Sequence, residues 1–248
     1  MRINAEAVPI FCKEDLKVDY EMNIFTRAVQ NAFCIFEKIV VMGLLRDREK
    51  QVRKRRIPDS FIYEILEGTP LYYKGYKNAI RNHQTAESIM GASSLQVFIL
   101  NYIVRILYRV CDESKYWIFF GEPGIHINHK NNLGGDILIY DKNTLPASKI
   151  SNHYADVSAE LQIEVDIRAE LEDMTETGYI KRKTDTLLEF GTKKIIWIFT
   201  FTQQVMIAEK GKDWLWIDWN KPIQLWHNET FCIGEHLKKE GVELEGKE

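Results

Sequence analysis

Two carboxylates in the second half of the chain occupy positions suited to holding a metal ion. Asp136 opens the apolar run DILIY just after two glycines, so its side chain should emerge where a strand begins. Glu164 lies inside the apolar run LQIEV, where a carboxylate that leaves water must gain a compensating partner. Hard divalent cations prefer carboxylate and carbonyl oxygens. If the two strands are neighbours, Asp136, Glu164 and the carbonyl of Val165 could bind one cation.

Lys183 supplies the positive group that such chemistry needs. It lies on a predicted helix over 177–190, with Leu187 and Gly191 at the following turns. A lysine beside a metal can hold the attacking water or a phosphate oxygen, while the cation neutralises developing charge and acidifies water. The combination indicates metal-dependent phosphodiester hydrolysis, with Asp136, Glu164 and Lys183 as candidate catalytic residues.

Each of these residues also has a structural interpretation. An aspartate at a strand end is commonly a turn or capping residue, and a helical lysine is commonly solvated and paired with a nearby acid. Glu164 is more diagnostic, because an acid between apolar strand residues lacks an obvious structural purpose. Glu64, in a predicted hairpin, could be a further acid of the site or an ordinary hairpin residue.

The elements that would position these residues are β-rich runs and stretches of helical periodicity. The run FIYEILEGTPLYY predicts a hairpin that turns at Glu67-Gly68. An apolar stripe predicts a long helix over 84–108, and the helix over 177–190 should end at Gly191. Strands are predicted at 116–122, 136–140, 159–167, 195–201, 204–210 and 214–219.

The chain divides by pattern into three parts. Residues 13–56 show helical periodicity and end in the basic run RDREKQVRKRR. We predict a helical extension over 1–56, a principal domain over 57–235 and a charged flexible tail over 236–248. The basic run is either a solvated helix end or a phosphate-contacting surface that includes Arg53 and Lys54. The extension could instead pack on another subunit.

The composition limits the classes of partner. The chain has 248 residues, of which 45% are hydrophobic, enough for one large core. Its formal net charge of -3 argues against nucleic-acid binding through a general surplus of basic residues, so any such contact must be local. No membrane span and no small-molecule cofactor are expected. Four widely separated cysteines predict free thiols and a cytoplasmic protein; they are Cys12, Cys34, Cys111 and Cys232.

Two further clusters are given structural interpretations. Trp214, Trp216 and Trp219 are interpreted as packing on one sheet and not as a platform for stacking bases, because strand positions two apart share a face. His126 and His129 lack a spacing typical of a metal site. Neither cluster is therefore expected to take part in chemistry.

The order of the motifs resembles the PD-(D/E)XK nuclease signature, and most closely the Uma-two family of restriction-endonuclease-like proteins. In that family a strand with Pro-Asp precedes a strand with Glu-Val, a helix with Lys, a nearby Gly and a strand with Tyr-Trp. This chain has, in the same order, Gly135-Asp136, Glu164-Val165, Lys183, Gly191 and Ile196-Trp197. The run YEILEG at 63–68 resembles the family's upstream hairpin, and His83 the histidine before its long helix. The likeness spans about Phe61 to Asp218.

The resemblance implies a fold and an activity. The fold would be α/β (α+β), a restriction-endonuclease-like core with a mixed β-sheet flanked by helices, following the N-terminal helical extension. The activity would be cleavage of DNA with Mg²⁺ or Mn²⁺ bound by Asp136, Glu164 and Val165. Lys181 and Arg182 would contact phosphates. A homodimer is expected by analogy, since two-fold symmetry suits the cutting of two strands.

Departures from the family's pattern keep an alternative open. Gly135 replaces the proline, and Asp166 stands two residues after Glu164, where the superfamily has a lysine whose role the resemblance assigns to Lys183. The connection over 141–159 is also long. The leading interpretation is a metal-dependent DNA endonuclease. The alternative is a catalytically inactive protein of the same fold that binds nucleic acid or a protein partner.

Overall fold

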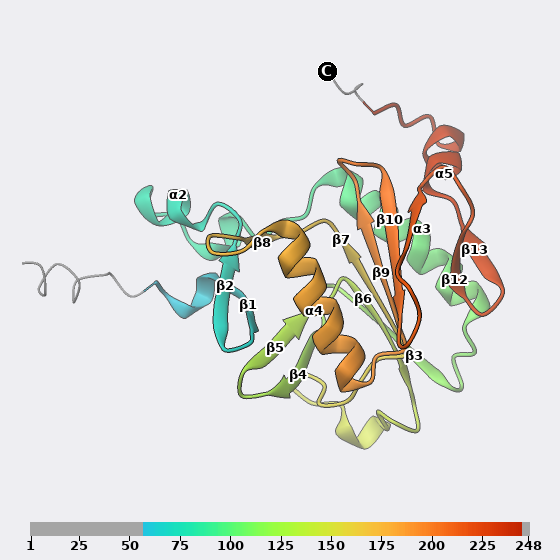
Figure 1. The fold of residues 1–248 in the computed structure, drawn as a ribbon, viewed down its shortest axis with the longest axis horizontal. Helices are drawn as coiled ribbons and strands as arrows, with labels where there is room; N and C mark the ends of the chain where they lie inside the picture. The colour runs from blue at the N-terminus through green and yellow to red at the C-terminus, as the bar shows by residue number, and fades with distance from the viewer. Residues whose placement is uncertain (1–56, 245–248) are drawn as a thin grey trace, which may run out of the picture. The chain divides into compact units, whose positions relative to one another are not determined.

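The computed structural model describes residues 57–244, so the predicted extension over 1–56, with Arg53 and Lys54, lies outside the described residues. Four α-helices lie in the described part of the chain (Figure 1). They are α2 (Tyr76–Arg81), α3 (Ser94–Val110), α4 (Glu176–Phe190) and α5 (Ile233–Lys239), with 3-10 turns at Asp59–Phe61, Ala86–Ser88 and Ala147–Lys149.

A six-stranded sheet with the order β11-β10-β9-β7-β6-β3 forms the centre of the fold. Its strands are β3 (Tyr116–Phe120), β6 (Ile137–Asp141), β7 (Leu161–Val165), β9 (Lys194–Phe199), β10 (Gln204–Glu209) and β11 (Leu215–Asp218). β7 and β9 are parallel and are connected through α4, whereas the other neighbouring pairs are antiparallel. The sheet is therefore mixed, as predicted.

A second sheet packs beside α4 and has the order β4-β5-β1-β2-β8. Its strands are β1 (Ile62–Leu66), β2 (Thr69–Tyr73), β4 (Gly124–Asn128), β5 (Asn131–Gly134) and β8 (Ala169–Glu170). The predicted β1–β2 hairpin is present, and its turn places Glu67 and Gly68 at φ values of 52° and 80°. The hairpin β4–β5 and the two-stranded sheet of β12 (Ile223–Trp226) and β13 (Glu229–Phe231) were not expected, because their short runs contain many polar residues.

The helices α3 and α4 cover opposite faces of the central sheet (Figure 1). Alternate residues of a strand point to opposite faces, so each buried strand contributes to both clusters. Leu161, Ile163 and Val165 of β7 pack in the cluster with α3. Ile195 and Trp197 of β9 pack in the cluster with α4. This alternation decides which side chains of the sheet can meet α4.

The long helix begins later than the sequence predicted. α3 starts at Ser94, ten residues after the expected start, and Gly91 precedes it without helical structure. The Ser93 hydroxyl accepts a hydrogen bond from the backbone N–H of Gln96 at 3.2 Å. A serine cap satisfies one of the N–H groups that a helix start leaves unpaired. The cap therefore fixes the helix start, and the apolar stripe alone did not reveal it.

The chain after His236 is partly packed in the core and does not begin a free tail at that residue. α5 continues to Lys239, and Leu237 is buried. Val242 and Leu244 pack against the cluster on the α3 face. The charges of this segment suggested a solvated tail, but its apolar residues recur at helical spacing and outweigh them. The last four residues, 245–248, lie outside the described residues.

The three tryptophans do not pack as one group, which corrects the expectation of a common face. Trp219 is buried in the α3-face cluster, whereas Trp214 packs against the α4-face cluster. Trp216 is 53% exposed and stacks on Phe199, with ring centroids 5.4 Å apart and an interplanar angle of 17°. The strand β11 ends at Asp218, so the alternation no longer holds at Trp219.

Other expectations about the described residues can be compared with the structure. Cys111 and Cys232 are buried free thiols, as predicted, while Cys12 and Cys34 lie outside the described residues. Over residues 57–244, no helix has the length and apolar character needed to cross a bilayer. The connection over 141–159 returns the chain so that β6 and β7 pair directly as antiparallel neighbours.

A buried hydrogen bond that joins α4 to the sheet provides a test of this packing. Trp197 Nε1 donates to Thr184 Oγ1 at 3.0 Å, and both side chains are buried. Thr184→Val keeps the shape of the side chain but leaves the indole N–H without its acceptor. The free energy of unfolding, measured in urea, should therefore fall by about 1–3 kcal/mol. In a Trp197→Phe background the same substitution should cost much less. An equal cost in both backgrounds would show that the bond does not stabilise the packing.

Candidate active site

The pairing of β6 with β7 brings Asp136 beside the end of β7. Ile137 pairs with Ile163, and the Asp136 N–H donates to the Ile163 carbonyl at 3.1 Å. The Asp136 carboxylate turns toward the same strand, where Oδ2 accepts a hydrogen bond from the Val165 N–H at 2.7 Å. Asp136 is only 6% exposed. The predicted neighbourhood of the two strands is therefore present.

Glu164 faces α4 because its position on β7 alternates with residues that face α3. Its Oε1 lies 3.0 Å from Lys183 Nζ. The side chain of Lys183 is fully buried, and that of Glu164 is 2% exposed. The structure thus brings Asp136, just before β6, into one buried cluster with Glu164 of β7 and Lys183 of α4, while their roles in catalysis stay predictions.

Glu64 belongs to the same cluster. Its Oε2 lies 2.9 Å from Lys183 Nζ and accepts a hydrogen bond from the Gly134 N–H at 3.3 Å. Its Oε1 accepts a hydrogen bond from the Tyr179 hydroxyl at 2.6 Å. Lys183 therefore lies between two carboxylates, one from β1 and one from β7. Of the two interpretations that the sequence left open, the geometry favours membership in the site over an ordinary hairpin position.

Two glutamines that sequence reasoning missed complete the hydrogen bonding. Gln162 Nε2 donates to Glu164 Oε1 at 2.5 Å and to the Gly134 carbonyl at 3.1 Å. Gln96 Nε2, from α3, donates to the Val165 carbonyl at 2.8 Å. Each left a signal in the sequence. Gln162 stands two residues before Glu164 and so shares its face of the strand, and Gln96 is a polar residue on the buried stripe of a helix.

Aromatic rings surround the ammonium of Lys183. Lys183 Nζ lies 5.6 Å from the ring centroid of Tyr63, 5.8 Å from that of Tyr179 and 5.5 Å from that of Trp197. The faces of aromatic rings attract cations, and more strongly where water is excluded. The rings therefore exclude water from Lys183 while partly replacing the interactions that water would give.

The burial of the cluster determines the pKa values of its groups. Burial raises the pKa of the Glu164 carboxyl to about 8, an effect that Lys183 opposes. Burial also raises the pKa of Asp136, against the hydrogen bond from the Val165 N–H. Burial alone would lower the pKa of Lys183, but Glu164 and Glu64 outweigh it and hold that pKa well above its ordinary value. Lys183 is therefore an ammonium group throughout the physiological range.

The charges and donor atoms of the cluster fit a divalent cation. When all groups are ionised, three carboxylates face one ammonium, so negative charge is in excess in a region buried from solvent. Asp136, Glu164 and the Val165 carbonyl supply the hard oxygen atoms that Mg²⁺ and Mn²⁺ prefer. Within residues 57–244, no group of three or more His, Cys, Asp and Glu side chains is arranged to hold a metal ion. A cation here would therefore need the backbone carbonyl as well as the two acids.

The departures from the family's pattern have local structural reasons. The Gly135 N–H donates to the Pro123 carbonyl at 3.1 Å, a bond that proline could not make. A Cβ on Gly135 would also lie 3.0 Å from Gln162 Nε2. Asp166 accepts hydrogen bonds from the Thr200 N–H at 2.8 Å and the Thr200 hydroxyl at 2.6 Å. Asp166 therefore connects the ends of β7 and β9 by hydrogen bonds. It does not take over the role of the superfamily's lysine at this position.

The predicted phosphate-contacting residues of α4 lie on its exposed side. Lys181 Nζ pairs with Asp185 at 2.6 Å, and Arg182 lies 3.5 Å from Glu67. Both side chains are more than half exposed, whereas Lys183 on the same helix is fully buried. Exposed pairs of this kind contribute little to stability and exchange partners at little cost. His83, exposed after α2, lies outside the described cluster.

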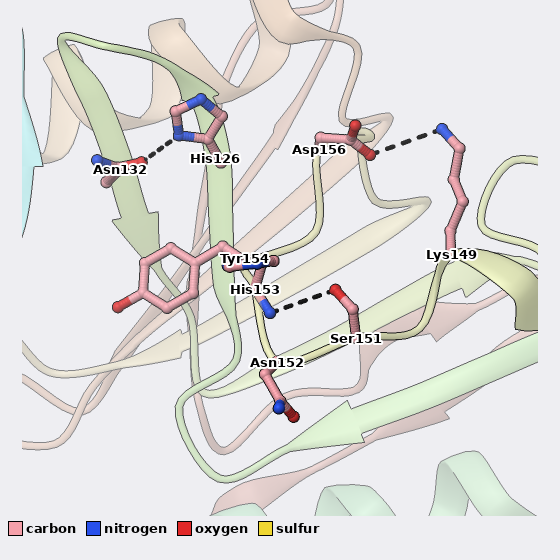
Figure 2. A pocket seen from close by; sticks show the side chains of 8 residues that line it. All are labelled: His126, Asn132, Lys149, Ser151, Asn152, His153, Tyr154 and Asp156. Atoms are coloured by element: carbon pink, nitrogen blue, oxygen red, sulfur yellow. Dashed lines mark hydrogen bonds and ion pairs between the residues drawn. The ribbon is translucent and has the colours of Figure 1, made fainter.

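A hollow of about 660 Å³ lies between β4 and the connection over 141–159, apart from this cluster (Figure 2). His126 Nδ1 lies 2.6 Å from Asn132 Oδ1, and Lys149 lies 3.6 Å from Asp156. Its lining includes neither the paired acids nor Lys183. Because its lysine and aspartate are both exposed and their charges are screened by solvent, the hollow is a weaker candidate for chemistry than the buried cluster.

A solved structure shares this fold. A protein from Anabaena variabilis ATCC 29413, described as a "putative nuclease belonging to DUF820", matches with a TM-score of 0.51 and 14% identity, covering 71% of this chain and 89% of that chain. DUF820 is the Uma-two family, so the match supports the resemblance that the motifs carry and a mixed α/β fold. At this identity the likeness establishes the fold alone. No protein-family model and no curated protein matches the sequence.

The raised pKa of Glu164 predicts a stability that falls with pH. A carboxyl that holds its proton more tightly in the folded state makes folding less favourable as pH rises from its ordinary value to its folded value. Here that window runs from the ordinary pKa of 4.5 to about 8. Glu164→Gln mimics the protonated form, so its thermal midpoint should increasingly exceed that of the parent across this window. Asp185→Asn, a control on the exposed side of α4, should show no such trend, and a constant difference would contradict the assignment.

Proposed function

We propose that this protein is a metal-dependent endonuclease that hydrolyses phosphodiester bonds of DNA at the cluster of Asp136, Glu164 and Lys183. The observation that carries the proposal is the convergence of two acids and one ammonium, 3.0 Å apart at Glu164 and Lys183, on a fold shared with a DUF820 protein. Neither feature suffices alone, because buried ion pairs also occur in structural cores and folds host many activities.

Each residue of the buried cluster has a defined part in this proposal. Asp136, Glu164 and the Val165 carbonyl would hold Mg²⁺ or Mn²⁺, which would neutralise charge on the phosphate and acidify a water molecule. Lys183 keeps its proton, so it acts as a donor to a phosphate oxygen or to the water and not as a base. Glu64 holds Lys183 from the opposite side at 2.9 Å and positions the ammonium.

Contacts with the DNA backbone are assigned to exposed basic groups. Lys181 and Arg182 lie on the outer side of α4, and their pairing with single surface acids leaves them able to bind phosphates instead. Arg53 and Lys54 are the further candidates. The chain's overall charge of -3 requires such local contacts. A homodimer would place two clusters on the two strands of a duplex.

A second candidate function is favoured because the donor atoms of the cluster already have partners within the protein. Lys183 is fully buried, Gln162 and Lys183 occupy Oε1 of Glu164, and Gln96 occupies the Val165 carbonyl. A protein that kept the fold for binding nucleic acid or a protein partner, without cleavage, would tolerate such closure. Cleavage by the first candidate requires these hydrogen bonds to rearrange when a cation binds.

Cleavage assays separate catalysis from folding. Asp136→Asn and Glu164→Gln should each lower Mg²⁺- or Mn²⁺-stimulated nicking of supercoiled plasmid DNA by about 100-fold or more, because each removes charge from the reacting centre. Glu164→Gln is expected at the same time to stabilise the fold. Glu189→Gln, at an exposed acid of α4 that has no part in the site, should cleave as the parent does. Cleavage at the parent's rate by either site variant would refute the assignment.

Metal binding can be tested without a substrate. Mn²⁺ should raise the thermal midpoint of the parent protein in a saturable manner, since a ligand that binds only the folded state stabilises it. Asp136→Asn should lose this shift, while Asp185→Asn should keep it. If the parent shows no saturable shift with Mn²⁺ or Mg²⁺, the non-cleaving candidate becomes the better one.

A further inference from the structure

An open groove with aromatic walls lies at the ends of the strands that carry the candidate site. We call it the aromatic groove and define it by Phe199, Phe201 and Trp216 on the sheet side and by Lys74, Glu176 and Ile180 opposite them. Its volume is about 550 Å³, within the range of small-molecule sites. The groove is therefore large enough for one nucleotide unit.

The aromatic groove borders the end of β7, the strand that carries Glu164 of the buried cluster. Asp166, which also lines it, directly follows Val165 of the candidate metal site. A series of rings leads outward from the ammonium of Lys183. Trp197 lies 5.5 Å from that ammonium and is nearly parallel to Phe199, at 3° and 6.0 Å, and Phe199 stacks in turn on Trp216. A flat group on these rings would lie at the approach to the reacting centre.

The outer rings of this series are open to solvent. Phe201 is 85% exposed and Trp216 is 53% exposed, although large apolar side chains normally avoid water. Exposed aromatic side chains beside a nucleic-acid site serve to stack bases, which present a flat face whatever their sequence. Bases in a duplex are already stacked, so such rings favour unpaired nucleotides.

The charges of the aromatic groove favour a base over a phosphate. Its lining includes one lysine and two carboxylates, Lys74 against Asp166 and Glu176, and the carboxylates would repel a phosphate group. A neutral base fits better, because carboxylate, hydroxyl and amide oxygens can accept hydrogen bonds from its N–H groups. Thr177, Thr202 and Gln204 supply such groups.

The size of the aromatic groove argues against a protein partner as its occupant. Stable protein interfaces involve roughly 20–30 residues on each side, whereas the groove is lined by twelve residues. From these observations we infer that the aromatic groove binds an unpaired nucleobase. The substrate class of the proposed endonuclease would then be DNA with a single-stranded segment, an inference that rests on the proposed function for its link to cleavage.

Binding without cleavage tests the inference. The full-length Asp136→Asn protein, in EDTA, is titrated with a fluorescent oligothymidylate of about 12 nucleotides, with a duplex of equal length and with an abasic strand of equal length. Fluorescence anisotropy should show the tightest binding to the oligothymidylate. In the same background, Trp216→Ala and Phe201→Ala should each weaken it between about 5-fold and about 150-fold. Trp216→Phe, which keeps an aromatic face, should lose much less.

Leu215→Ala is the matched control, because Leu215 is 55% exposed and is the neighbour of Trp216 on the same strand, with its side chain on the opposite face. It should bind as its background does. Equal affinity for the abasic strand would overturn the inference in favour of phosphate contacts. Unchanged binding by both alanine variants would also overturn it. So would a change from dimer to monomer on Trp216→Ala, since the rings would then serve self-association. Failure of the proposed cleavage would leave these binding results intact, so the two can fail separately.

Discussion

The burial of one ammonium group among three carboxyls is the constraint on which the site and much of the packing depend. Lys183 contacts Glu64 at 2.9 Å and Glu164 at 3.0 Å without access to water. Removing Lys183 would leave its carboxylate partners uncompensated in the core, which is among the most destabilising changes a core can undergo. This pairing therefore ties together β1, β7 and α4. Those elements are far apart in sequence, so their relative placement depends on charge compensation as well as on apolar packing.

The excess of carboxyls over ammonium groups can be offset in two ways, and the difference between them bears on function. Without a cation, the pKa of Glu164 of about 8 indicates that a proton compensates part of the charge at neutral pH. A divalent cation at Asp136 and Glu164 would have to displace that proton, so binding should tighten as pH rises toward 8. The groups of the cluster bond to one another, which is thus compatible with a metal site in its metal-free form. It is equally compatible with an inert ion pair, which is why cation binding separates the two candidate functions.

Sequence reasoning predicted the parts of the structure that depend on local pattern. The β1–β2 hairpin, the buried strands and the α4 helix with its cap at Gly191 follow from alternation, helical periodicity and turn chemistry. Glu164 was singled out because a carboxylate in an apolar run needs a compensating partner, Asp136 because it opens a strand, and Lys183 because it lies on the helix that follows them. Gln96 was not, because its partner Val165 lies 69 residues away and only the tertiary fold brings them together. The start of α3 was wrong because a single serine cap fixes it, and α5 was missed because apolar residues are sparse in a charged segment.

Trp216 shows what the alternation of a strand predicts and what it does not. The alternation of β11 correctly places it on the α4 face, and Met206 separates it from Trp197 across the sheet. Alternation gives the face, however, and not the extent of the helix that covers it. α4 begins at Glu176, and its first turn lines the aromatic groove with Ile180 while Trp216 and Phe201 remain exposed. Whether an aromatic ring on a sheet packs in the core or stays exposed for binding therefore depends on how far the covering helix extends. That extent depends on contacts distant in sequence.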